Sequence, residues 1–167
     1  DRSPIVTDKR HTFLELKIRA TNQLNGSIQN LSAICTSVLD VYDGVSWSKQ
    51  PTQNPAWAFV DLLTGQVNKR PVDKSRLHMD SILEWADFCE EIPTAPTGRL
   101  YQLPRFRCDF VLDYAGTLQS VLNQVTSAAQ ASLNIVDGKY GVLIDRLRTV
   151  PVQLFTPRNS RDFSSSR

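Results

Sequence analysis

The sequence has little that would support metal or disulfide chemistry. Its 167 residues include three cysteines, Cys35, Cys89 and Cys108, and two histidines, His11 and His78. The cysteines are odd in number, far apart and without a CxxC pair, which argues against a disulfide framework and against a structural zinc site. Neither histidine has a second histidine or a cysteine three or four positions away. We therefore predict reduced, buried cysteines, structural or solvent-facing histidines, and no metal or other cofactor.

The chain also lacks an excess of charge and a long apolar run. Its 19 basic and 17 acidic residues give a net charge of +2, so no chain-wide positive field attracts nucleic acid or an anionic membrane. Charge or glycine interrupts each apolar run well before the roughly 20 residues that a membrane-spanning helix needs. We expect no membrane insertion and no nucleic-acid binding through a dedicated motif. The arginines toward the C-terminus form no dense cluster: Arg146, Arg148, Arg158, Arg161 and Arg167.

Signatures of common enzymes are missing as well. The sequence has no GxSxG, HExxH, GxxxxGK[ST] or GxGxxG motif. Asp80, Glu84 and Asp87 fall on neighbouring turns of a predicted helix, as an acid/base pair might. A working carboxylate pair needs a partly desolvated cleft to separate its pKa values, so we interpret these residues as a solvated helix face. We predict no catalytic residues.

Neither end of the chain resembles a natural terminus. "DRSPIVTDKR" has no initiator methionine and no apolar core of a signal peptide, and "NSRDFSSSR" ends in serine and arginine. We expect a piece of a longer polypeptide.

What is present begins with strand patterns. Apolar and polar residues alternate over 11–21, which predicts a half-buried strand, and Asn25-Gly26 is a turn signal. Residues 28–42 look extended and β-branched up to Asp43-Gly44. The polar stretch "SKQPTQ", residues 48–53, is predicted to be a loop. We expect antiparallel strands in this part.

Two helices follow in the first half. In "NPAWAFVDLLTGQ", Asn54 suits the N-cap, Pro55 the first helical position and Gly65 a left-handed exit. A second helix is predicted from about Asp80, with Ser75 as an earlier alternative, after a connector that contains Pro71. Its apolar side holds Ile82, Leu83, Ala86, Phe88 and Cys89, with Trp85 at the margin.

The second half follows a proline-rich loop at 93–104. "RFRCDFVLDY" alternates as a strand, with Phe106, Cys108, Phe110 and Leu112 on one face. A helix begins behind a Thr117 cap, with its apolar residues running to Ser132. Asp137-Gly138 between two apolar segments is a strong hairpin signal. After it, the chain looks extended.

These elements predict an α+β fold, with mixed or antiparallel strands and about three helices packed on them. We divide the chain into 1–92, with strands and two helices, the loop 93–104, and 105–167, with a strand-helix-hairpin unit and an extended end. The predicted core holds Trp57, Phe59, Leu62, Ile82, Trp85, Phe88, Leu118, Val121 and Leu122.

Six blocks, taken in order, resemble a known family. They are "QLNGSIQNLSAIC", "NPAWAFVDLLTG", "SRLHMDSILEWADFCEE", "RFRCDFVLDYAGTLQSVLNQV", "NIVDGKYGVLID" and "LFTPRNSRDFS". The family is the tail tip, or host-specificity protein J, family of long-tailed bacteriophages and prophages. The similarity runs from about Leu14 to Phe163, and "NPAWAFVDLL", "WADFC" and "LFTPRN" are its most telling parts. The family commonly has an aromatic residue near "FS" after "LFTPRN", where this chain reads "DFSSSR".

The resemblance implies a structural virion protein and not an enzyme. Its members form a homotrimeric hub that closes the distal end of the tail tube and continues into a central fibre. It implies contacts with other copies and with tail tip or tail tube proteins, and a location in the virion tail tip after assembly in the host cytoplasm. Receptor binding belongs to sequence outside this chain. No catalytic, cofactor-binding or metal-binding residue carries over.

Within these blocks, ten residues are predicted to act as structural or interface residues: Asn54, Pro55, Trp57, Phe59, Leu62, Trp85, Phe88, Phe155, Pro157 and Asn159. Large apolar side chains are common at the buried centres of contacts between subunits, so sequence leaves open which of them face a neighbouring chain. Two other functions stay open. A module that binds a sugar or peptide would use exposed aromatics such as Trp47 and Tyr101. A cell-wall hydrolase would use an acidic site such as Asp80 or Glu84.

Overall fold

A computed structural model describes residues 32–94, 98, 102–112, 116–149, 156, 158–159 and 161. The chain divides into two compact units, 1–35 and 36–167. Only residues 32–35 of the first unit are described, and the described helices and strands all lie in the second unit. The strand predicted at 11–21 and the Asn25-Gly26 turn lie outside the described residues.

The second unit begins with an antiparallel hairpin. β1 (Val38–Tyr42) pairs with β2 (Trp47–Pro51), in a register that places Asp40 opposite Lys49. In the turn between them, the Asp43 carboxylate accepts hydrogen bonds from the backbone N–H groups of Val45 and Ser46, at 2.8 and 2.6 Å. The expectation of antiparallel strands is confirmed for this pair.

The loop predicted at 48–53 is wrong for its first four residues, because Ser48 to Pro51 belong to β2. These residues are polar, or proline, yet each pairs with a residue of β1. One face of a two-stranded sheet is open to water, so a strand there needs few apolar side chains.

Helix α1 (Pro55–Thr64) has the predicted start but not the predicted end. The Asn54 side chain accepts a hydrogen bond from the Ala56 N–H, and Pro55 occupies the first helical turn. Gly65, however, leaves the helix in an extended conformation, with φ −75° and ψ 164°. Glycine is needed there for a different reason: a Cβ atom would lie 2.4 Å from the Asp61 carbonyl oxygen.

Helix α2 (Met79–Glu90) begins one residue before the predicted Asp80, and the His78 imidazole accepts a hydrogen bond from the Ser81 N–H at its first turn. The alternative start at Ser75 corresponds to a separate 3₁₀ turn, η1 (Lys74–Arg76), which is capped by the Asp73 side chain. The alternative start at Ser75 is therefore wrong for α2, because the chain passes through this separate turn before the helix begins.

Residues 105–112 do not form the predicted strand. The N–H of Phe106 donates to the Cys89 carbonyl at the end of α2, and the N–H of Cys108 donates to the Gln53 carbonyl in a loop. The alternating sequence is real, but these partners belong to no neighbouring strand. A strand pattern predicts pairing only where the fold places another strand beside it.

Helix α3 (Leu118–Ala128) and the hairpin after it follow the prediction closely. Thr117 caps the helix through a hydrogen bond from the Ser120 N–H. β3 (Ala131–Val136) and β4 (Lys139–Ile144) pair antiparallel around Asp137 and Gly138, whose φ angles of 51° and 74° match a type I′ turn. The helix is shorter than its apolar pattern, since Ser132 lies in β3.

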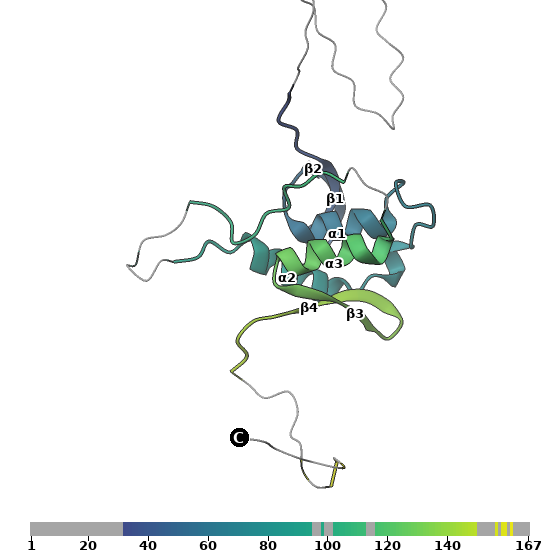
Figure 1. The fold of residues 1–167 in the computed structure, drawn as a ribbon, viewed down its shortest axis with the longest axis vertical. Helices are drawn as coiled ribbons and strands as arrows, with labels where there is room; N and C mark the ends of the chain where they lie inside the picture. Colours follow the sequence, from purple (N-terminus) through teal and green to yellow (C-terminus); the bar gives the residue numbers. More distant parts are fainter. Residues whose placement is uncertain are drawn as a thin grey trace, which may run out of the picture. The chain divides into compact units, whose positions relative to one another are not determined.

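The α+β prediction is confirmed: the described residues hold three α-helices and two antiparallel two-stranded sheets. The two hairpins do not join into one sheet. In Figure 1 the helices lie between them, with α1 against β1, α2 against β4 and α3 against β3. Helices from both sides of the loop predicted at 93–104 therefore share one core, because α1 also contacts α2 and α3.

The core differs from its prediction at several side chains. Trp85 lies at its centre with 0% exposure, not at the margin of α2. Leu118 was predicted to be buried but is 37% exposed, because it lies in the first, outward-facing turn of α3. Leu62 and Phe88 are half-buried. The remaining predicted core residues are buried: Trp57, Phe59, Ile82, Val121 and Leu122.

Candidate functional site

The start of α1 is joined to α2 by one buried side chain. Asn54 is 5% exposed, and its amide nitrogen donates to the Ala86 carbonyl at 3.0 Å and to the Glu90 carboxylate at 2.9 Å. Its amide oxygen simultaneously caps α1 through the Ala56 N–H. Asn54 therefore holds the first turn of α1 against the last turns of α2, and an uncharged amide is required because the group must both donate and accept.

The aromatic row of α1 faces the chain's own core. Trp57 and Phe59 are 4% and 0% exposed. The Phe59 ring meets the Trp85 indole edge to face, with centroids 5.9 Å apart, and the Trp85 N–H donates to the Ala129 carbonyl at 3.0 Å. These side chains are packing residues of the fold. Of the apolar candidates for contact with a neighbour, only Leu62 and Phe88 keep partial exposure among the described residues.

Trp47 is the one aromatic of the proposed sugar or peptide site that the structure describes; Tyr101 lies outside the described residues. Trp47 is half-buried, packed against Tyr42 and Trp57 with ring centroids 5.0 and 6.4 Å away. The Lys74 ammonium lies 3.9 Å from the centroid of its ring. The indole is thus engaged on several sides, which disfavours a free platform for a sugar ring.

Lys74 connects this aromatic group to a charged cluster that the sequence did not reveal. Its ammonium lies 2.8 Å from Asp40, which also pairs with Lys49 at 3.3 Å. The hydrogen bond from Lys74 holds the pKa of the Asp40 carboxyl below its usual value of 3.8. Asp61 nearby behaves oppositely: burial raises the pKa of its carboxyl, despite an opposing pull from Lys49. It also lies near the negative end of α1.

These two carboxyl groups should give opposite pH dependences. We expect Asp61→Asn to raise the free energy of unfolding at neutral pH, because burial destabilises the charged form of Asp61 in the native state. The gain should shrink as the pH falls through the raised folded-state pKa and should vanish below 3.8, where Asp61 is protonated in both states.

Asp40→Asn is the matched control for that measurement. The ionised Asp40 contributes stability above pH 3.8, and this contribution is lost as the pH falls through its depressed folded-state pKa. Urea unfolding of both variants over a pH series should therefore show a gain for Asp61→Asn and a loss for Asp40→Asn at neutral pH. A change in the free energy of unfolding with the same sign for both variants would contradict the opposite pKa shifts of Asp61 and Asp40.

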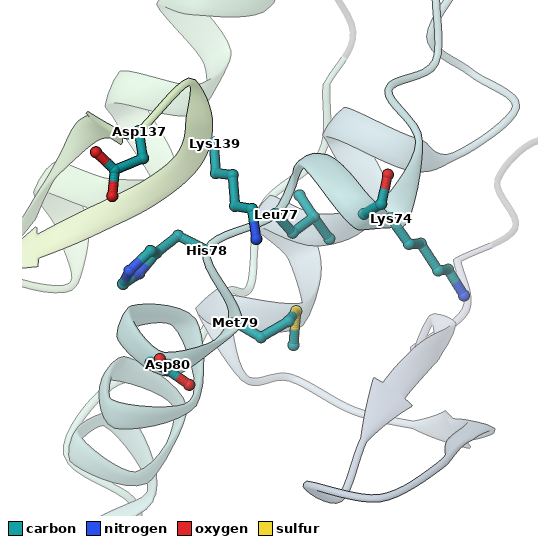
Figure 2. A pocket seen from close by; sticks show the side chains of 8 residues that line it. Lys74, Leu77, His78, Met79, Asp80, Asp137 and Lys139 are labelled. Atoms are coloured by element: carbon teal, nitrogen blue, oxygen red, sulfur yellow. The ribbon is translucent and has the colours of Figure 1, made fainter.

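A shallow cleft of about 460 Å³ lies where η1 and the start of α2 meet the turn of the β3–β4 hairpin. Figure 2 shows Lys139 reaching toward the stretch from Leu77 to Met79, whereas Lys74 points away toward the first hairpin. The His78 imidazole caps the N-terminus of α2, and the backbone N–H of His78 donates to the Tyr140 carbonyl at 2.7 Å. The polar side chains thus diverge, and the cleft presents no convergent catalytic set.

The titratable residues considered from sequence are not brought together. Asp80, Glu84 and Asp87 are exposed along α2, and Glu84 pairs with Arg146. Cys89 is buried, and burial raises the pKa of its thiol to about 12. Within the described ranges, no three histidine, cysteine, aspartate or glutamate residues are placed to hold a metal ion.

The expectation of three buried cysteines is wrong for Cys35, which is exposed in the first unit. Cys108 is half-buried, and burial raises the pKa of its thiol to about 11. Apolar neighbours in sequence do not bury a side chain unless the fold closes over it. For Cys89 and Cys108, a raised pKa keeps the thiol protonated at neutral pH and therefore a weak nucleophile.

Two of the three C-terminal candidates, Phe155 and Pro157, lie outside the described residues. The Asn159 side chain accepts hydrogen bonds from the N–H and hydroxyl of Thr156 at 2.6 and 3.2 Å, and the Asn159 N–H donates to the Thr156 carbonyl. Asn159 therefore closes a local turn, which agrees with a structural role.

No protein-family model matches the chain, and no curated protein is significantly similar to it. No helix in the described ranges has both the length and the apolar character needed to cross a membrane.

Proposed function

We propose that this chain is part of a structural protein of a bacteriophage or prophage tail tip, the baseplate hub from which the central fibre continues. In the full-length protein three copies form the hub, which contacts other tail tip or tail tube proteins and serves host attachment through sequence outside this chain. The protein works by assembly in the host cytoplasm and then resides at the virion tail tip. It is not an enzyme.

One observation carries this proposal: two of the sequence blocks that resemble the family meet in space. "NPAWAFVDLL" supplies α1, and "WADFC" lies in α2. Asn54, immediately before Pro55, donates to the carbonyl of Ala86, and Phe59 packs on Trp85. The blocks thus fit one folding unit whose characteristic residues maintain its shape. A hub depends on shape, because its contacts are made between rigid complementary surfaces.

Labelling of assembled tails tests the proposal. An epitope inserted beside Val45, which is 88% exposed in the β1–β2 turn, should leave the fold intact because loop tips tolerate insertion. In the full-length protein, a gold-conjugated antibody should mark the distal end of isolated tails by electron microscopy. The same epitope in the major tail tube protein is the control and should label the whole tube. Label along the tube, on the head, or absent from intact tails would contradict the proposal.

A further inference from the structure

The stretch Arg105–Leu112, which we call the edge segment, has one side bound to the molecule and one side free. The N–H groups of Phe106 and Cys108 donate inward, to the Cys89 and Gln53 carbonyls at 3.1 and 2.7 Å. Phe106 and Cys108 are half-buried, whereas Arg107 and Asp109 between them are exposed. This two-residue period is that of an extended chain, so the backbone groups of Arg107 and Asp109 point outward.

Those outward groups are unused. In the part of the chain that the structure describes, the N–H groups of Arg107 and Asp109 donate no hydrogen bond, and no carbonyl of the edge segment accepts one from a backbone N–H. Three consecutive apolar residues follow, with Phe110, Val111 and Leu112 exposed by 46%, 84% and 41%. An extended edge with free backbone groups and exposed apolar side chains can pair with a strand of another chain.

The sequence of this edge is self-complementary. Around Cys108 it reads Phe106, Arg107, Cys108, Asp109, Phe110, so opposite charges and two aromatic rings stand at equal distances from the centre. We propose that the edge segment pairs antiparallel with the edge segment of a second copy of this chain, about a two-fold axis at Cys108. Arg107 then faces Asp109 of the second copy, and Phe106 faces its Phe110, each pair occurring twice.

The backbone requires the same register as the side chains. In an antiparallel pair, residues whose N–H and C=O groups face the partner lie opposite each other. Arg107 and Asp109 both present their backbone groups outward, so they form hydrogen-bonded pairs in the register that also joins their charges. The side chains of Phe106 and Phe110 lie on the opposite face of the pair from the charges. Phe110 of one copy covers Phe106 of the other, and each Phe106 packs on Phe88 of its own chain with ring centroids 5.9 Å apart. Cross-strand ion pairs and aromatic pairs both stabilise such sheets.

Within one chain, Arg107 already lies 3.4 Å from Asp109. The Arg107 guanidinium also donates to the side-chain oxygen of Gln53. Both contacts are exposed, and exposed contacts of this kind contribute little in water, so exchanging them for the pairs between copies has a small cost. The contact is short, and we expect a reversible dimer that weakens with added salt. It is isologous, whereas a ring of three uses heterologous contacts. The pairing is therefore a different contact from those that would join three copies in the proposed hub.

Sedimentation equilibrium of the 167-residue chain over a concentration series tests the pairing. The mass should rise from 18.8 kDa toward twice that value. Asp109→Arg places like charges opposite each other twice and should raise the dissociation constant at least about tenfold. The double exchange Arg107→Asp with Asp109→Arg restores complementary pairs and should restore the dimer. Asp87→Arg is the matched control, since Asp87 is an exposed acid on α2 outside the edge segment.

Phe110→Ser provides a second variant that leaves the charges unchanged, and it should also weaken the dimer. Circular dichroism spectra that match the parent chain verify that each variant is folded. A chain that stays monomeric at every concentration would overturn the pairing. So would a dimer that Asp109→Arg leaves unchanged, a double exchange that fails to restore association, or a self-associated state that is a trimer.

Discussion

Trp85→Ala should lower the free energy of unfolding by about 3–5 kcal/mol, the largest effect we expect from a single substitution in the described core. Trp85 is fully buried, with its ring against Phe59 and its N–H bonded to the Ala129 carbonyl at 3.0 Å. It therefore connects all three helices, since Phe59 lies in α1 and Ala129 closes α3. Removing the indole leaves a cavity where these elements meet and removes the donor of that carbonyl.

Urea unfolding followed by circular dichroism measures this effect. Trp85→Phe separates its two causes, because phenylalanine fills much of the volume but leaves the buried Ala129 carbonyl without its donor, at a cost of about 1–3 kcal/mol. Val67→Ala is the control, since Val67 is 87% exposed and lies outside the edge segment, and it should change stability by no more than about 0.5 kcal/mol. A loss for Trp85→Ala no larger than that of the control would show that the core is not centred on this residue.

Asn54→Asp should destabilise the chain more than Asn54→Ala does, although aspartate is nearly the same shape as asparagine. Alanine removes the helix cap and the two amide donor bonds, at a cost of about 2–3 kcal/mol. Aspartate keeps the cap oxygen but places a carboxylate against the Ala86 carbonyl and the Glu90 carboxylate. Repulsion between the new, buried carboxylate and the exposed Glu90 carboxylate then adds to the lost hydrogen bonds.

Thermal and urea unfolding of the two variants gives the order of stability at neutral pH. Glu90→Gln in the Asn54→Asp background should recover part of the loss, because it removes one of the two carboxylates. The same Glu90→Gln change in the parent chain is the control and should have a smaller effect, since a neutral amide oxygen still accepts from Asn54. If Asn54→Asp were as stable as the parent chain, the amide could not be the donor that joins α1 to α2.

Local chemistry predicted the starts of elements well. Asn54 with Pro55 begins α1, Thr117 begins α3, and Asp137 with Gly138 forms the turn of the β3–β4 hairpin. Each of these signals depends on atoms within about four residues of sequence, because a cap or a tight turn is completed by its own neighbours. Such features can therefore be predicted from the sequence without knowledge of the fold.

Features that depend on distant partners were missed. The polar β2 is a strand because β1 lies beside it, and residues 105–112 are not a strand because their inward hydrogen bonds go to the end of α2 and to a loop. Trp85 was predicted at a helix margin because helical periodicity cannot foresee that its indole N–H donates to the Ala129 carbonyl at the end of α3. An alternating or periodic pattern shows which face of an element could be buried. Whether that face is buried depends on the elements that pack against it.

The candidate site follows the same division. The sequence identified Asn54 as a cap, but its bonds to Ala86 and Glu90 span 32 and 36 residues and leave no sequence signature. The ion pair of Lys74 with Asp40, across 34 residues, is equally invisible. The size and spacing of Trp57 and Phe59 predicted that they are structural or interface residues. Only the fold shows that both side chains are buried in the chain's own core.

Electron cryomicroscopy of tails carrying the full-length protein tests the central claim, that this chain is a structural part of a phage tail tip. We expect density for the fold of residues 36–149, with its helices between two hairpins, in three copies around the axis at the distal end of the tail tube. A resolved tail tip with no density for this fold, or with a single copy off the axis, would contradict the hub assignment.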